Sequence, residues 1–164
     1  RKKEMTCPIS IFIEQEKEVD SVISQETFES WINEIELELG PDLFEDFSSV
    51  SIGLVSKKTI QGLNQTYREK DAPTNVLAFE GDVGLGEELN SLGDIAICPE
   101  VLREEALEQS KDESHHFAHL FIHGILHLIG YNHEKTFEAE EMEKLEIRIL
   151  NRLGIADPYQ IDLI

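Results

Sequence analysis

The order of apolar and polar positions along the chain predicts short strands in its first two thirds and long helices in its last third. Runs rich in β-branched or apolar residues are typical of strands, and they occur at residues 9–13, 50–55, 76–79 and 95–98. Apolar residues also recur at helical spacing between 28 and 39. Strands and helices that segregate in this way predict an α+β fold with one small mixed sheet and about five to six helices.

Capping residues set the expected limits of two further helices. Ser56 is a suitable N-cap for a helix whose inner face carries Ile60, Leu63 and Tyr67. Pro99 suits the first turn of another helix, because its missing N–H would have no helical partner there. The glycine-rich acidic stretch before the strand at 95–98 is expected to be a surface loop.

Two more helices follow, and they contain most of the histidines and many of the acids. We expect Ser114 to cap the first, which ends at Gly130, and the second to run from about Thr136 to Leu153, before Gly154. We interpret the acids of the last helix as a solvated face opposite an apolar stripe. This acidic face comprises Glu138, Glu140, Glu141, Glu143 and Glu146.

Composition and charge place the chain among ordinary globular proteins with an unusual acidity. Its 164 residues fit a single domain spanning 1–164, and 40% of them are hydrophobic, which suffices for one core. The formal net charge of −20 disfavours nucleic acid and membrane partners at first reading. Residues 50–75 depart from this trend, since their four basic and two acidic residues give a local charge of +2.

The remaining counts favour a cytoplasmic location. No apolar run reaches the length of about 18 residues that a membrane-spanning helix needs. Cys7 and Cys98 are too few for a disulfide framework and are expected to be small buried side chains. Whether Arg1 to Glu4 belong to the native chain is left open by the sequence.

All six histidines lie between residues 115 and 133. His119, His123 and His127 follow at intervals of four, which places them on one face of a helix that is otherwise apolar on almost every side. Any one of them would be satisfied as a hydrogen-bonded core residue, but three neighbouring imidazoles are hard to satisfy in that way.

The spacing H-x-x-x-H-x-x-G-x-x-H, occupied by His123, His127, Gly130 and His133, predicts a metal site. Two ligands stand one helical turn apart, and the glycine lets the chain turn to bring the third. Three imidazoles with an open fourth position are typical of catalytic zinc. The same spacing is found in metzincin proteases, but Gly124 stands where their catalytic glutamate would be, which disfavours peptide cleavage.

The run HGILHLIGYNH at residues 123–133 resembles the signature of the YbeY family of RNA maturation factors. Residues 67–79 (YREKDAPTNVLAF), 92–95 (LGDI) and 157–159 (DPY) are similar to other blocks of that family. Two positions depart from its usual pattern, with Asn132 in place of aspartate and Ala78 in place of a frequent serine.

The resemblance implies a zinc-dependent endoribonuclease that acts on single-stranded RNA in small-subunit ribosomal RNA maturation and ribosome quality control. His123, His127 and His133 would bind one zinc ion, with water as the fourth ligand. Arg68 would be the functional arginine, stabilising charge on the phosphate. Ribosomal RNA precursors and the small ribosomal subunit or its proteins would be the partners.

The sequence leaves open alternative roles for two residues and alternative functions for the protein. Without the resemblance we would expect Arg68 to form a surface ion pair. His119 is either an additional acid or base, or a core histidine bonded to the backbone. A zinc peptidase, and a non-catalytic ribosome assembly factor whose zinc only holds the fold, are the competing functions.

Overall fold

The computed structural model describes residues 7–21, 23–81, 90–131 and 136–160. Within these ranges it contains the predicted small mixed sheet together with five helices, which confirms the α+β class. The elements in chain order are β1 (Ser10–Gln15), α1 (Gln25–Leu39), β2 (Ser49–Leu54), α2 (Lys57–Arg68), β3 (Val76–Glu80), β4 (Ser91–Ile97), α3 (Pro99–Glu108), α4 (Glu113–Ile129) and α5 (Thr136–Arg152). The expected surface loop falls largely on residues 82–89, outside the described residues.

The sheet has the strand order β1-β2-β4-β3, in which β1, β2 and β4 are parallel and β3 pairs antiparallel with β4. Alternate residues of β2 (Val50, Ile52 and Leu54) are buried, as a strand with one face on the core requires. β3 is an edge strand, and α4 packs beside it. This neighbourhood of β3 and α4 positions the candidate site.

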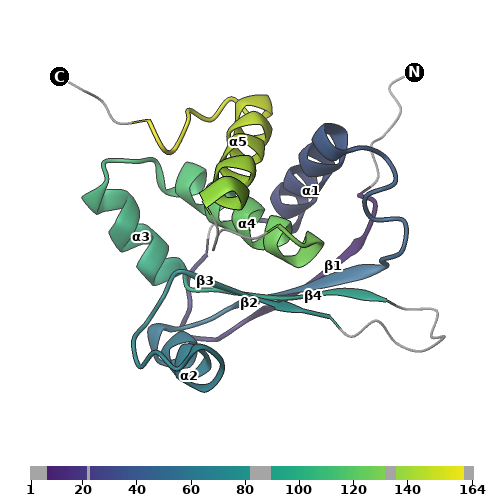
Figure 1. The fold of residues 1–164 in the computed structure, drawn as a ribbon. Coiled ribbons are helices and arrows are strands. Elements are labelled where there is room, and N and C mark those ends of the chain that lie inside the picture. Colours follow the sequence, from purple (N-terminus) through teal and green to yellow (C-terminus); the bar gives the residue numbers. More distant parts are fainter. Residues whose placement is uncertain (1–6, 22, 82–89, 132–135, 161–164) are drawn as a thin grey trace.

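Helices α1, α3, α4 and α5 cover one face of the sheet, whereas α2 lies on the other (Figure 1). Rings from α1 and α4 form the centre of the main core, where Phe28 and Trp31 meet Phe117 and Phe121 at centroid distances of 5.1 to 6.1 Å. A smaller cluster that includes Ile60 and Ala96 joins α2 to the opposite face. The predicted all-round burial of α4 is therefore explained by its place between the sheet and three other helices.

The capping residues expected from the sequence are confirmed with one exception. Ser56 accepts the N–H of Thr59 as expected. The prediction of Ser114 as N-cap of α4 was wrong, because Asp112 has the extended backbone of a cap and its carboxylate accepts the N–H of His115. Ser114 lies inside the first turn, where its hydroxyl donates to the same carboxylate at 2.6 Å.

The expected inner face of α2 also needs a correction. Ile60 is fully buried, but Tyr67 is 61% exposed and only leans against Phe79, with 5.0 Å between ring centroids. Asn64 takes the buried position instead, since its amide donates to the carbonyl of Ala72.

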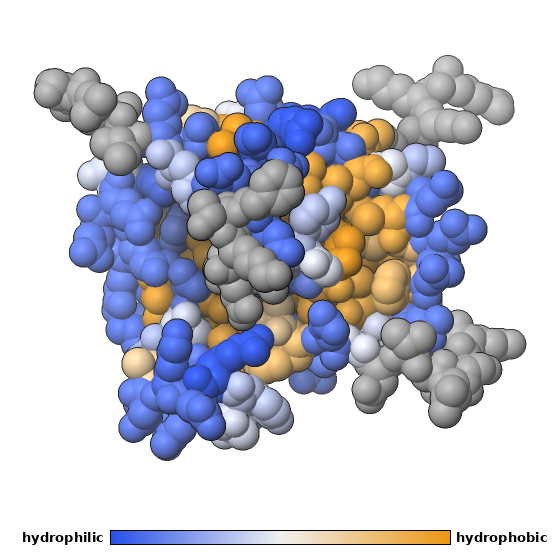
Figure 2. All heavy atoms as spheres, viewed as in Figure 1, coloured by the Kyte–Doolittle hydropathy of each residue, from blue (hydrophilic) through white to orange (hydrophobic). Residues whose placement is uncertain are grey.

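The surface is largely hydrophilic, as expected from the many charged residues of the chain. Hydrophilic side chains gather over α2 and α3, while apolar side chains are visible between α1 and the sheet (Figure 2). None of the described helices has the length and apolar character needed to cross a membrane. Cys7 and Cys98 are both free thiols. Cys98 is buried as predicted, whereas Cys7 is only partly buried, contrary to the prediction.

Candidate active site

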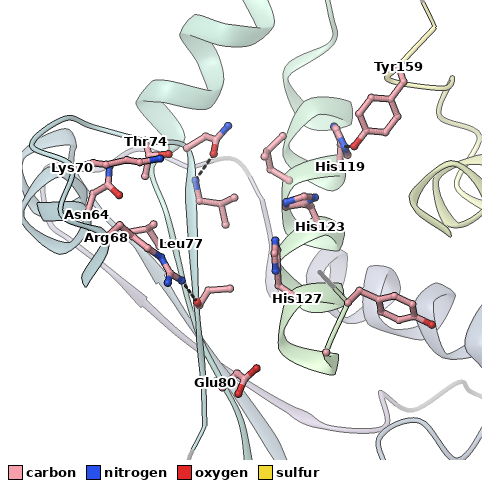
Figure 3. A pocket seen from close by; sticks show the side chains of 17 residues that line it. Asn64, Arg68, Lys70, Thr74, Leu77, Glu80, His119, His123, His127 and Tyr159 are labelled. Carbon is pink, nitrogen blue, oxygen red and sulfur yellow. Dashed lines mark hydrogen bonds between the residues drawn. The ribbon is translucent and has the colours of Figure 1, made fainter. Parts of the chain in front are cut away.

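A cavity of about 660 Å³ lies between α4 on one side and the end of α2 with β3 on the other. His119, His123 and His127 point into it from α4, and Arg68 and Lys70 approach from the opposite wall (Figure 3). The structure thus brings the predicted arginine and three of the predicted histidines to one site.

Three histidines of α4, His119, His123 and His127, stand one above another on a single face of the helix (Figure 3). The ring centroids of His119 and His123 are 6.4 Å apart, and those of His123 and His127 are 4.8 Å apart. Spacing by four residues produces this stack because successive turns of a helix rise by about 5.4 Å. Two imidazoles of neighbouring turns can therefore reach one ion.

The predicted set of three histidine ligands is only partly visible. His133 and the unusual Asn132 lie outside the described residues. Among the described residues, no three His, Cys, Asp or Glu side chains are grouped closely enough to hold a metal. His123 and His127 nevertheless form a donor pair that suits zinc. The three-histidine site stays a prediction.

Glu146 contradicts the interpretation of the α5 acids as a solvated face. Its side chain is 0% exposed, and Oε1 accepts a hydrogen bond of 2.5 Å from Nδ1 of His123. A metal-binding histidine usually makes such a bond to a carboxylate through its other ring nitrogen. This contact is a second feature of the donor set that fits a metal.

The charge state of Glu146 follows from its surroundings. Burial alone would raise the pKa of this carboxyl group, but the imidazoles of His119 and His123 and the hydroxyl of Tyr159 outweigh burial and lower the pKa to about 2. Glu146 is therefore an ionised acceptor at neutral pH. Because an ionised carboxylate has no proton to give, the proton of the 2.5 Å bond belongs to Nδ1 of His123.

Tyr159 completes this cluster from the segment that follows α5. Its hydroxyl donates to Oε2 of Glu146 at 2.5 Å and lies 3.1 Å from Nε2 of His119. Burial, followed by the bond to Glu146, raises the pKa of Tyr159 well above its ordinary value, so the hydroxyl keeps its proton. Since that proton is shared with Glu146, His119 donates to the Tyr159 oxygen.

Arg68 lies in the last turn of α2 and reaches across to β3. Its Nη2 donates to the carbonyl of Ala78 at 3.1 Å, and its guanidinium lies 5.8 Å from the ring centroid of Phe79. None of the ion pairs shown by the described residues includes Arg68, in contrast to the ion pair expected on general grounds. Because Ala78 contributes its backbone carbonyl, the departure from serine at this position leaves the contact unchanged.

The loop after α2 is held by Asn64. Its amide donates to the carbonyl of Ala72 at 2.9 Å, while the backbone N–H of Lys70 donates to the carbonyl of Asn64. Glu69 adopts the left-handed conformation with φ 59° and thereby ends the helix. These contacts place Lys70 at the cavity beside Arg68 (Figure 3).

Gly124, which follows the first histidine of the motif, lies where α4 approaches the sheet. A Cβ atom there would come within 3.3 Å of the Ile95 side chain and 3.5 Å of the Val76 side chain. A glutamate would have to grow into these packed side chains. The position therefore serves helix packing, which agrees with the expectation that no metzincin-type base is present.

His116 has a similar bond nearer the start of the same helix. Its ring is 5% exposed, and Nε2 lies 2.9 Å from Oε1 of Glu105. Glu105 also accepts from the amide of Asn75, whose own Oδ1 accepts the N–H of Val76 at 2.7 Å. His115 is exposed at the start of α4. His116 therefore links α3, α4 and the start of β3.

Comparison with known proteins settles the family. A family model described as "Endoribonuclease YbeY" matches residues 10–154. A protein named "Endoribonuclease YbeY" from Colwellia psychrerythraea is 48% identical over 136 residues, covering 83% of this chain and 87% of that protein. Another of the same name from Alkalilimnicola ehrlichii is 52% identical over 117 residues, or 70% of each chain. The chain belongs to the YbeY family.

A solved structure has a similar fold. The solution structure of TM1509 from Thermotoga maritima matches with a TM-score of 0.53 and 27% sequence identity. The match covers 92% of this chain and 99% of that protein. The family model and the two named relatives confirm, at the level of the family, the resemblance inferred from the motifs.

The YbeY motifs did not point to Glu146, although the sequence contains a signal for it. Met142 and Ile149 belong to the apolar stripe of α5, and Glu146 follows the first by four residues and precedes the second by three. An acid at a stripe position is expected to be buried and paired. Tyr159 lies beyond the helix, where no periodicity indicates which way a side chain points.

Proposed function

We propose that this protein is a zinc-dependent endoribonuclease that cleaves single-stranded RNA in the cytoplasm, during small-subunit ribosomal RNA processing and ribosome quality control. The observation that supports this most is one cavity with His123 and His127 on one wall and Arg68 and Lys70 on the other, in a chain of the YbeY family. Cationic donors opposite a metal-binding pair suit a phosphodiester between them.

The residues divide the work between the two walls. Zinc held by His123, His127 and the predicted ligand His133 would supply a Lewis acid at the phosphodiester. Arg68 binds the phosphate through its planar fork of donors and stabilises the negative charge that develops there. His119, which lines the same cavity, is the proposed acid or base.

Two aromatic residues of the cavity favour a single strand. Tyr131 and Tyr159 line it with aromatic rings, on which unpaired bases stack. Bases held in a duplex already stack on one another and are not available to these rings. The cavity is therefore better suited to an unpaired segment of ribosomal RNA than to a helix.

The acidity of the chain gives the ribosome a role in delivering the substrate. A net charge of −20 opposes the approach of RNA over most of the surface. Arg68 and Lys70 offset this only locally, while Lys57 is already paired with Glu104 at 2.5 Å. We therefore expect weak, salt-sensitive binding to free RNA, with the small ribosomal subunit or one of its proteins supplying the remaining affinity.

The test is cleavage of an end-labelled single-stranded RNA by the purified full chain, with zinc added or removed by a chelator. The same RNA annealed to its complement tests strand specificity. Arg68→Gln is expected to lower kcat/KM by about 100-fold, because one donor to developing charge is lost. The matched control is Arg148→Gln, since Arg148 is exposed and pairs with Glu38 far from the cavity.

Each outcome has a clear meaning. Cleavage that survives chelation, or that Arg68→Gln and Arg148→Gln change equally, would contradict the proposal. Zinc binding without any cleavage would favour the non-catalytic assembly factor. Cleavage of an unstructured peptide in place of RNA would favour the peptidase. That result would be unexpected, because the packing around Gly124 leaves no room for a metzincin-type glutamate.

A further inference from the structure

Glu146 is the only acid of the described residues that is buried. An ionised carboxylate loses its hydration when it is buried, and this is tolerated only when partners replace the lost water. Replacing such a buried network by apolar side chains often leaves a fold equally stable. Stability alone is therefore a weak reason for a carboxylate at this position.

Both oxygens of this carboxylate have partners from other parts of the chain. Oε1 accepts from Nδ1 of His123 on α4, and Oε2 accepts from the hydroxyl of Tyr159, each at 2.5 Å. Nε2 of His119 lies 3.6 Å from Oε1. All three neighbouring rings line the cavity, so Glu146 supports the cavity wall from behind.

The position of Tyr159 is itself fixed by the fold. Its N–H donates to Oδ1 of Asp157 at 2.8 Å, and Nζ of Lys111 donates to the neighbouring carbonyl of Pro158 at 3.1 Å. Lys111 belongs to the turn before α4. The segment after α5 is therefore tied to the start of the histidine helix, and the Tyr159 hydroxyl is directed at Glu146.

We propose that Glu146, oriented by Tyr159, is a positioning residue that fixes His123 as its Nδ1-protonated tautomer and thereby assigns Nε2 to the metal. The inference rests on the proposed zinc site, which it deepens. A histidine in water exchanges between two tautomers and several ring orientations. One strong acceptor behind the ring removes that freedom before the metal arrives, which increases affinity by lowering the cost of ordering.

The decisive measurement is the tautomer of His123 in the metal-free full chain, read from the 15N chemical shifts of its imidazole. Wild type is expected to show a protonated Nδ1. Glu146→Leu keeps a side chain of similar size without an acceptor, and is expected to lose the Nδ1-protonated form. A role in packing alone would leave the tautomer unchanged.

Zinc affinity provides the second readout, by titration with a competing chelator. Loss of an outer partner of a metal-binding histidine lowers affinity by about 10- to 100-fold, and we expect this for Glu146→Leu. Tyr159→Phe removes one donor to Glu146 and is expected to cause a smaller loss. The matched control is Glu140→Gln, because Glu140 is an exposed acid on the same helix.

The amide NMR spectrum of each sample reports whether it is folded. If Glu146→Leu fails to fold, the wild-type tautomer and the affinity of Tyr159→Phe still decide the matter. A wild-type His123 protonated at Nε2, or a zinc affinity of Tyr159→Phe equal to that of Glu140→Gln, would overturn the inference. A chain that shows the expected tautomer and binds zinc but cleaves no RNA would refute the proposed function alone.

Discussion

Helix α4 carries two histidine–carboxylate pairs that look alike in outline. His116 bonds to Glu105 of α3 at 2.9 Å, and His123 bonds to Glu146 of α5 at 2.5 Å. The two histidines are seven residues apart, or about two helical turns, so both lie near one face of the helix. Each pair joins α4 to a neighbouring helix.

The two pairs bury opposite partners. In the first, the His116 ring is 5% exposed and the Glu105 side chain 29%, whereas in the second the His123 ring is 23% exposed and Glu146 is 0% exposed. In the first pair, a buried ring and a partly exposed carboxylate hold two helices together. A buried carboxylate behind an accessible ring supports a group that acts on something outside the protein. The difference in burial therefore separates a structural pair from the candidate active pair.

The largest expected effect comes from replacing each histidine by glutamine, which has a similar size and no imidazole. His123→Gln is expected to reduce RNA cleavage by at least about 100-fold, since a lost metal ligand removes charge stabilisation at the reacting centre. His116→Gln is expected to retain cleavage within a few-fold, because His116 does not line the main cavity. Initial rates on one labelled RNA compare them, and equal losses would refute the distinction.

Zinc should separate the same variants through stability. A ligand that binds only the folded state stabilises it by about 2.7 kcal/mol at a free concentration 100 times its Kd. Wild type and His116→Gln should both gain this stabilisation, and His123→Gln should gain little. Urea unfolding with zinc and with chelator measures the gain. A zinc effect that His123→Gln retains would place the metal elsewhere.

The sequence predicted those features that neighbouring residues determine. Ser56 and Pro99 start helices, and their spacing from the apolar pattern was sufficient to identify them. Asp112 and Ser114 are equally good caps by residue type, so only the path of the backbone decides between them.

The part of the site that lies on the single helix α4 was predictable from the sequence. His119, His123 and His127 share a face because of their spacing alone. The pairing of His123 with Glu146 depends on how α5 is rotated against α4, and no local pattern determines that rotation. Tyr159 depends further on the path of an irregular segment. Contacts between distant segments of the chain therefore determine the part of the site that the sequence motifs do not predict.

Glu105 offers the next test, at the level of stability. Glu105→Ala would leave both the His116 ring and the Asn75 amide without their acceptor, at an expected cost of about 1–3 kcal/mol. Glu104→Ala is the matched control, since it removes only an exposed ion pair with Lys57, worth about 0–1 kcal/mol. Urea unfolding of both variants measures the difference, and equal costs would show that the buried pair contributes no more than the exposed one.

The smallest expected effect is the pH dependence of the His116 pair. Burial lowers the pKa of His116 below 6.5, while the bond to Glu105 opposes this and the nearby His119 and Lys111 add to it. The unfolded chain therefore binds a proton at a higher pH than the folded chain does, so stability falls as the pH drops from 6.5 toward the lowered folded pKa. His116→Gln cannot take up this proton and should lose less stability between pH 7.5 and 5.5. One proton limits the difference in slope to about 1.4 kcal/mol per pH unit, and parallel curves for the two proteins would contradict the assignment.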